Sequence, residues 1–342
     1  MKTQNALRGL FVGVLGWLLA GLAAAPESRA QDGALAEAVA VYQAADFDGA
    51  IDRFSAILDD DAADKATRKQ ALQYLGRAYV AKRMEDKART VIHELLELEP
   101  PLVELNPDIE PPPLMNLYYE VRKDFEGDYT VERADPGLVT LAIVDFTNNS
   151  ISDDRERLDA LERGFPSLLI NQLNGATNLK VIERERIQWL LQELELQRDP
   201  GLVDQSTAVR TGKLLGATAV LFGTFIKHGR DMNISARLVK VETGEILLAE
   251  QVKGRADKFF ELAEELSLNV ARSINVNLEK TQLGTRTETR SLDAMLSYSE
   301  GLALIEKSDY QSAFAKFMEA LEYDPSYERA RRKAESLRPL LG

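Results

Sequence analysis

The chain has 342 residues, which allows two or three domains at roughly 100–200 residues each. With 55 acidic and 42 basic residues it carries a net charge of −13, which would repel the phosphate backbone at long range and argues against nucleic acid as a partner. The sequence contains no cysteine, which excludes disulfides and thiolate metal sites.

The N-terminus has the pattern of a secretory signal peptide. Lys2 and Arg8 precede an apolar run over 10–25, and the tripeptide at 28–30 offers the small residues that a signal peptidase reads. We expect 1–30 to be removed, which leaves a periplasmic chain that could associate with the outer membrane. The alternative is an uncleaved anchor, because the apolar run is at the short edge of what spans a bilayer. No later stretch is apolar enough to span a membrane.

Residues 31–126 show the spacing of paired antiparallel helices. Small residues recur where two helices would cross closely, and large apolar residues recur where the gap between them needs filling. The positions concerned are Leu72, Leu75, Gly76, Tyr79, Ala88, Ile92 and Pro100. This spacing resembles the tetratricopeptide (TPR) repeat, with a looser copy around 47–54 and a capping helix over 114–125. The alternative is that any helical hairpin would place apolar residues near these positions.

The resemblance to TPR repeats implies a groove that is lined by the inner helices and binds a segment of a protein partner. On the first full repeat this face carries Gln70, Gln73 and Arg77. We therefore predict that these three residues contact a protein partner.

Prolines are concentrated between the front repeats and the centre of the chain. Six of the 12 prolines lie within residues 100–113. Such a segment is not expected to be helical, and it favours an extended, stiff conformation. We expect either a spacer or a strap laid over the repeats, and a ligand for an aromatic groove is a further alternative.

Residues 136–280 alternate between strand and helix patterns. The block opens on an apolar run with β-branched residues, which is typical of a strand buried on both faces. Later, three strands with short turns predict a meander, which a long amphipathic helix closes. The expected strands are 140–146, 178–183, 218–226, 232–241 and 246–254, and the expected helices are 158–173, 184–197, 205–215 and 259–278. Pro166 is expected to kink or split the first of these helices.

Four segments of this block, in this order, resemble the CsgG-like family, which is named for the curli assembly and transport component. They are LAIVDF (141–146), VIERERIQWLLQELELQ (181–197), GKLLGATAVLFGTF (212–225) and RLVKVETGEIL (237–247). The resemblance implies an α+β fold in which a central mixed β-sheet packs against helices, as in CsgG and the N-terminal domain of TolB. The family resemblance extends to lipoprotein activators of penicillin-binding proteins and a flagellar outer-membrane protein, which implies work in envelope assembly.

Two details of this resemblance concern anchoring and charge. In the curli channel, as the resemblance implies, an acylated N-terminal cysteine anchors the protein, whereas this sequence has no cysteine, so we expect no lipid anchor of that kind. The charged part of the second segment consists of Glu183, Arg184, Glu185 and Arg186. We interpret these residues as surface or intersubunit ion pairs with a structural role.

A second TPR-like pattern occupies 291–342 and would flank the central block with a further helical hairpin. Its positions are Gly301, Tyr310, Ala313, Phe317, Ala320 and Pro325, and the helix over 327–337 is expected to cap it. The inner face carries Met295, Tyr298 and Leu302, which we predict to contact a partner. Because one repeat makes only a shallow groove, this unit could instead dock onto the central domain or onto another subunit.

No grouping of residues predicts catalysis. The two histidines, His93 and His228, have no cysteine or second histidine at ligand spacing, and no glycine-rich phosphate loop follows a strand. We therefore expect neither a metal nor a cofactor, and no enzymatic activity.

The expected function is that of a non-enzymatic periplasmic scaffold in secretion or surface-structure assembly. It would bind protein partners of the cell envelope through its repeats and its CsgG-like domain, and it could assemble with copies of itself. The alternative is a regulator of a peptidoglycan-synthesising enzyme.

Overall fold

The computed structural model describes most of the chain after the apolar N-terminal run. The described residues are 26–98, 104–127, 129, 138–151, 155–174, 176–193, 205–279, 283 and 288–341, with side chains from 33 onward. The predicted signal peptide lies outside the described residues up to position 25, and Pro26 begins the first helix. Within the described part of the chain, no helix combines the length and the apolar character that a membrane span requires.

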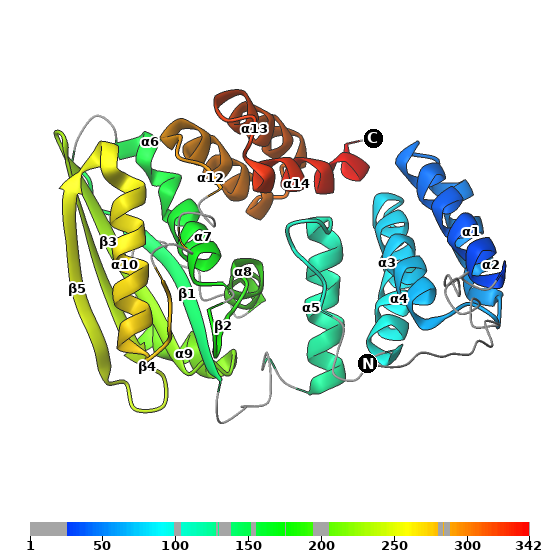
Figure 1. Cartoon of the computed structure of the whole chain (residues 1–342), viewed down its shortest axis with the longest axis horizontal. Coiled ribbons are helices and arrows are strands. Elements are labelled where there is room, and N and C mark those ends of the chain that lie inside the picture. The colour runs from blue at the N-terminus through cyan, green and yellow to red at the C-terminus, as the bar shows by residue number, and fades with distance from the viewer. Residues whose placement is uncertain are drawn as a thin grey trace, which may run out of the picture.

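The centre of the molecule is a five-stranded mixed sheet in the order β2-β1-β3-β4-β5 (Figure 1). Its strands are β1 (Val139–Asn148), β2 (Leu179–Val181), β3 (Ala219–His228), β4 (Asp231–Lys240) and β5 (Ile246–Arg255). β1 runs parallel to both of its neighbours, whereas β3, β4 and β5 form an antiparallel meander. The predicted mixed sheet is therefore confirmed. The tight turn after β3 uses Gly229 at φ +57°, a left-handed conformation that glycine adopts without steric cost.

Helices cover both faces of this sheet. They are α6 (Arg155–Asp159), α7 (Leu161–Leu173), α8 (Arg184–Glu193), α9 (Gln205–Leu214), the short 3-10 helix η1 (Ala256–Lys258) and α10 (Phe259–Ser273). Because side chains alternate along a strand, Leu141 and Ile143 of β1 pack into one cluster with α7 and α10, whereas Ala142 and Val144 pack into another with α8 and α9.

Two expectations for these helices were wrong in detail. The helix around Pro166 is interrupted upstream, at Ala160, and α7 continues through the proline. The closing helix ends at Ser273 instead of reaching 278, because Asn275 takes a positive φ of 56° and turns the chain away. Both departures shift an element boundary and leave the layer arrangement unchanged.

Among the residues that the structure describes, five helices precede the sheet. They are α1 (Pro26–Gln43), α2 (Phe47–Asp59), α3 (Lys65–Ala81), α4 (Glu85–Leu98) and α5 (Pro112–Glu126). Asp46 and Asp64 cap two of them, since their carboxylates accept hydrogen bonds from the backbone N–H groups of Gly49 and Thr67. The helical hairpins lie where the sequence predicts them, and their identity as TPR repeats stays a prediction.

The proline-rich segment departs from its expected conformation at its end. Pro112 and Pro113 begin α5, although 100–113 was expected to be non-helical throughout. The first turn of a helix tolerates proline, because the N–H group that proline lacks has no partner within the helix there. Residues 99–103 lie outside the described part, and 104–111 form a non-helical connection between α4 and α5.

The C-terminal helices α12 (Leu292–Glu306), α13 (Tyr310–Tyr323) and α14 (Glu328–Leu337) end in the short 3-10 helix η2 (Arg338–Leu340). They lie between the sheet and the N-terminal helices, with the C-terminus beside the latter (Figure 1). α12 packs on α7 and η2 contacts α3. The C-terminal hairpin therefore docks onto the central sheet unit, as one of the two alternatives expected, and it also reaches the N-terminal helices.

Candidate functional site

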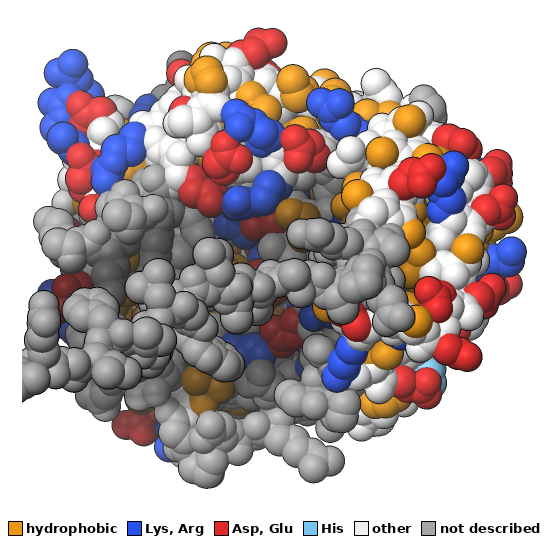
Figure 2. All heavy atoms as spheres, turned by 45° about the vertical axis from the view of Figure 1, so that its right-hand side comes forward, with side chains coloured by type: hydrophobic (Ala, Val, Ile, Leu, Met, Phe, Trp, Pro, Cys, Tyr) orange, Lys and Arg blue, Asp and Glu red, His pale blue; other side chains and the backbone are white. Residues whose placement is uncertain are grey.

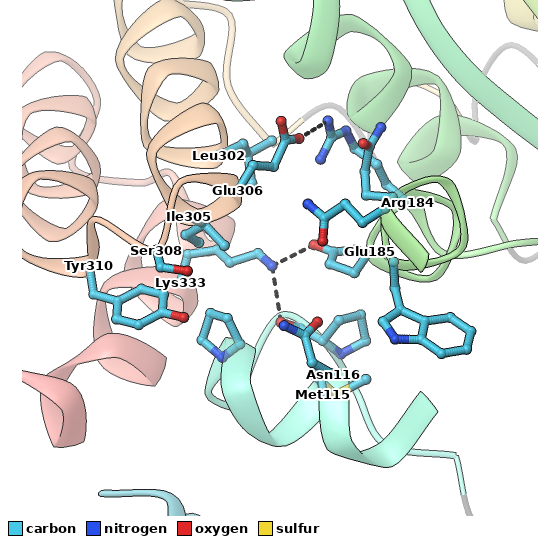
Figure 3. A pocket seen from close by; sticks show the side chains of 15 residues that line it. Met115, Asn116, Arg184, Glu185, Leu302, Ile305, Glu306, Ser308, Tyr310 and Lys333 are labelled. Carbon is cyan, nitrogen blue, oxygen red and sulfur yellow. Dashed lines mark hydrogen bonds and ion pairs between the residues drawn. The ribbon is translucent and has the colours of Figure 1, made fainter. Parts of the chain in front are cut away.

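The charged segment of the CsgG-like motif lies where four helices converge. Glu183 lies in the short connection after β2, and Arg184 begins α8. α5, α12 and α14 approach this point from parts of the chain that lie far apart in sequence (Figure 3). The motif is therefore enclosed by the same chain, which corrects the interpretation of its charges as surface or intersubunit ion pairs.

Four residues, which we call the junction cluster, connect α8 to the C-terminal helix and to the proline-rich connection. They are Asp108, Glu185, Arg329 and Lys333. Lys333 Nζ donates to Glu185 Oε1 at 2.5 Å and to the carbonyl oxygen of Pro107 at 3.0 Å. Arg329 Nε donates to Asp108 Oδ1 at 3.0 Å, and its Nη1 donates to the carbonyl oxygen of Ser167 in α7 at 3.1 Å. The cluster thus fixes α14 to three separate segments.

The second set of ion pairs holds α12 against the sheet. Arg184 Nη2 donates to Glu306 Oε1 at 2.6 Å and lies 3.3 Å from Asp145 Oδ1, at the end of the buried part of β1. Arg163 Nε of α7 donates to the other carboxylate oxygen of Glu306 at 2.8 Å. Gln188 Nε2 donates to Asp145 Oδ2 at 3.0 Å. Each of these charges is therefore compensated by a charge on another element.

Burial makes these pairs different from ordinary surface ion pairs. Lys333 is only 2% exposed, Arg184 4% and Arg329 6%. A charge removed from water in this way is tolerated only when it is paired and hydrogen-bonded, and the loss of one partner leaves the other uncompensated. The junction cluster and the ion pairs of Arg184 are therefore expected to fix the orientation of α12 and α14 on the sheet unit more strongly than exposed pairs could.

Two neighbouring carboxyl groups of the motif have opposite pKa shifts. Burial raises the pKa of Glu183 to about 7, and the nearby negative charges of Glu185 and Asp108 add to this shift. Burial also acts against the ionised form of Glu185, but Lys333 and Arg329 outweigh it and hold the pKa of Glu185 below its usual range. Glu185 is therefore the charged partner, and Glu183 titrates near neutral pH.

A small cavity of about 90 Å³ lies beside these pairs. Its apolar wall comes from Met115 of α5, Trp189 of α8, and Leu302 and Ile305 of α12. Figure 3 shows Arg184, Glu185, Glu306 and Lys333 around the same space. Its small volume and mixed lining suit a packing defect between docked helices better than the binding of a drug-sized ligand.

The predicted partner-binding residues of the N-terminal unit lie along α3. Gln70 is exposed and Gln73 is half-buried. Arg77 forms a bidentate ion pair with the buried Glu110, with both N···O distances at 2.7 Å, and it lines a hollow on the side of α3 toward the C-terminus. The structure thus brings Arg77 to a concave surface, and partner binding by the three residues stays a prediction.

The predicted residues of the C-terminal unit lie in the interior. Met295 and Tyr298 are each 1% exposed and Leu302 is 3% exposed. Met295 packs into the core that α12 shares with α7 and α10, and Tyr298 packs among the side chains of α13 and α14. α7 covers Met295, and the packing of α12 with α13 and α14 covers Tyr298 and Leu302, so a partner could reach them only after these helices have moved. Their role in binding a partner stays a prediction.

Sequence reasoning missed Asp108, Arg329 and Lys333. A weak signal for the two basic residues exists, because they are four residues apart and next to Ala330 and Ala334, on the buried side of α14. A basic pair on the small-residue face of a helix indicates a buried acidic partner. No feature of the sequence around Asp108 indicates which cation it meets.

Among the described residues, no three His, Asp or Glu side chains are grouped as a metal site would require. The geometry of the junction is instead that of a structural connection between units. Its charged groups face one another across helices of the same chain.

Part of the sheet unit matches a family model. Residues 130–236 match the family described as curli production assembly/transport component CsgG. The matched range begins before β1, includes the motif at 183–186, and ends within β4. The helical hairpins on either side lie outside it.

Solved structures superpose on part of the chain with low similarity. TolB from Acinetobacter baumannii shares 13% identity at a TM-score of 0.27, covering 40% of this chain and 28% of TolB. The LpoB C-terminal domain from Salmonella enterica shares 19% identity at a TM-score of 0.27, covering 34% of this chain and 82% of that domain. Lipoprotein GNA1162 from Neisseria meningitidis shares 17% identity at a TM-score of 0.28, covering 40% of this chain and 99% of the lipoprotein. No curated protein matches the chain.

Proposed function

We propose that the protein is a non-enzymatic scaffold of the cell envelope, which binds protein partners in secretion or in the assembly of a surface structure. The observation that carries this proposal is the match of residues 130–236 to a family described by assembly and transport. The predicted signal peptide supports an exported, periplasmic location, since such a peptide directs a chain out of the cytoplasm.

The flanking helices supply the partner-binding part of the proposal. We assign them to TPR repeats, whose inner helices offer a surface for a partner. On α3 this surface includes the exposed Gln70 and the half-buried Gln73. The ion pairs of the junction support a scaffold because they hold these helices in one orientation relative to the sheet unit.

Affinity capture after crosslinking in intact cells tests the proposal. The full chain carries a C-terminal tag, and a Gln70→Arg/Gln73→Arg variant is compared with an Arg237→Glu control, which changes an exposed residue on β4. We expect the wild type and the control to capture specific envelope proteins. The α3 variant should capture these proteins with less than about one tenth of the wild-type yield. A wild-type chain that is monomeric and captures no envelope protein would overturn the proposal.

Regulation of a peptidoglycan-synthesising enzyme is the alternative function that the sequence suggests. Added to a purified bifunctional penicillin-binding protein, the chain should then raise the rate of glycan polymerisation or crosslinking. An unchanged rate at saturating concentration removes this alternative and leaves the scaffold proposal intact.

A further inference from the structure

A hollow of about 560 Å³ lies between the N-terminal helices and the C-terminal end of the chain. One wall comes from the end of α1, the start of α2 and the middle of α3, and the other comes from α14 and η2. Ile109 and Pro111 of the proline-rich connection complete it. Its volume lies within the range of roughly 300–1,000 Å³ that is typical of ligand sites.

The apolar part of the hollow is a set of packed aromatic rings. The ring centroids of Tyr42 and Phe47 are 5.5 Å apart, and those of Tyr42 and Tyr74 are 5.2 Å apart in an edge-on arrangement. Tyr74 also stacks on the buried Phe54 at 5.3 Å, which holds the group in place. Beside these rings Ile109 is 42% exposed, an unusual exposure for a large aliphatic side chain next to an aromatic surface.

The polar part of the hollow contains one arginine, Arg338, that has no ion pair among the described residues. The lining of the hollow contains Arg77, Arg332 and Arg338 but one acidic residue, Glu335. Arg77 is neutralised by Glu110, and Arg332 donates to Glu288 at 3.1 Å. Arg338 is exposed, and no ion pair to it exists within the described part of the chain. By contrast, acidic side chains are spread over the outer side of the N-terminal helices (Figure 2).

We propose that this hollow binds an extended, acidic segment of a protein partner. Aromatic grooves bind extended segments through proline or aliphatic side chains that lie against the rings. An arginine without an internal partner is suited to a carboxylate, which it can bind through two parallel hydrogen bonds. The segment therefore places proline or an aliphatic residue on Tyr42 and Tyr74 and a carboxylate on Arg338.

This inference rests on the proposed function and specifies the partner's chemistry. It also requires both flanking units, because η2 supplies Arg338 and the α1–α3 region supplies the rings. η2 contacts α3 directly, so the two walls are held together in the folded chain. Neither helical unit alone would form the site.

Retention of peptide pools on the immobilised full chain tests this inference. Three pools of decapeptides are compared. All contain two prolines, and Leu, Ile, Val or Ser chosen at random at the variable positions. The pools differ at two fixed positions, which carry Asp, Asn or Lys. We expect at least tenfold greater retention of the Asp pool than of the Asn pool, and no retention of the Lys pool. Arg338→Glu should abolish the preference for Asp, whereas the control Arg237→Glu should keep it. Tyr42→Leu should lower the retention of both the Asp and the Asn pools.

Equal retention of the Asp and Asn pools, or an Arg338→Glu variant that keeps the preference, overturns the inference. The Arg338→Glu variant, used in the affinity capture from intact cells, separates this failure from a failure of the scaffold proposal. If the wild type and Arg338→Glu capture the same envelope proteins in equal yield, the hollow is not the partner site and the scaffold stands. If no envelope protein is captured while the Asp pool binds through Arg338, the chemistry of the hollow stands and the scaffold falls.

Discussion

Lys333 is the residue whose replacement tests the junction most sharply. Its side chain is 2% exposed, and its ammonium group bonds to Glu185, whose side chain is 20% exposed, and to the carbonyl oxygen of Pro107. Removing one partner of a buried ion pair typically costs about 3–5 kcal/mol, because the other charge stays buried without compensation. Since Glu185 retains some contact with solvent, we expect Lys333→Met to lower the free energy of unfolding by about 3 kcal/mol, at the low end of this range.

A double-mutant cycle separates the ion pair from simple loss of packing. In the Glu185→Gln/Lys333→Met double variant no uncompensated charge remains, so about 1–2 kcal/mol of the loss should be recovered. The surface control is Lys316→Met, which removes the ion pairs of Lys316 with Glu300 and Glu319. All three side chains are partly exposed to solvent. Exposed pairs contribute little, so the control should cost less than about 1 kcal/mol.

The assay for this cycle is urea unfolding followed by tryptophan fluorescence. In a chain that starts at residue 31, Trp189 is the one tryptophan. It is 6% exposed and lines the small cavity of the junction, so its emission reports on this contact directly. A Lys333→Met variant that is no less stable than Lys316→Met would refute the reasoning about the junction cluster.

Three further predictions concern pH and packing. The pKa of Glu183 is raised from 4.5 to about 7, so between these pH values the folded state binds more protons than the unfolded state. The contribution of Glu183 to the free energy of unfolding therefore falls as the pH rises from 4.5 to about 7. Glu183→Gln should flatten this fall in urea titrations at a series of pH values, and an unchanged slope would contradict the shift. Gly164→Ala should destabilise the α7–α12 contact by about 1–3 kcal/mol through overpacking, because the new Cβ would lie 1.7 Å from Ser299 Oγ. Ser299→Gly in the same chain should restore the thermal midpoint, and a failure to do so would place the strain elsewhere. Glu306→Gln removes the ion-pair partner of Arg163 and one of the two partners of Arg184, which keeps Asp145, and should cost about 3 kcal/mol in the same urea assay, whereas a loss below about 1 kcal/mol would show that these pairs do not hold α12.

Much of the sheet unit could be predicted from short-range patterns. The run around Ile143 is apolar on both sides because both faces of β1 are covered, and the three meander strands end within two residues of their expected limits. These features depend on residues close in sequence, whose spacing indicates which face of a strand or helix is buried. The helical hairpins follow from the same kind of pattern.

The junction could not be predicted in this way because its partners are distant in sequence. Arg329 and Asp108 are 221 residues apart, and Lys333 and Glu185 are 148 apart. No period or spacing relates such residues, and charged side chains are ordinarily expected at the surface. For the same reason the sequence suggests surface or intersubunit ion pairs for the motif at 183–186, and the hollow between α3 and α14 could not be predicted from either helix alone.

The central claim is that buried ion pairs hold the two helical units and the sheet unit in one fixed arrangement. Because the chain has no cysteine, spin labels can be placed at Gln70→Cys or Gln311→Cys, each paired with Arg237→Cys, on exposed positions of α3, α13 and β4. Double electron–electron resonance on both label pairs measures the distances between the units directly. We predict one narrow distance distribution for each pair, with that of the Gln311 pair broadening in Lys333→Met. Broad distributions in the otherwise unchanged chain would contradict the claim.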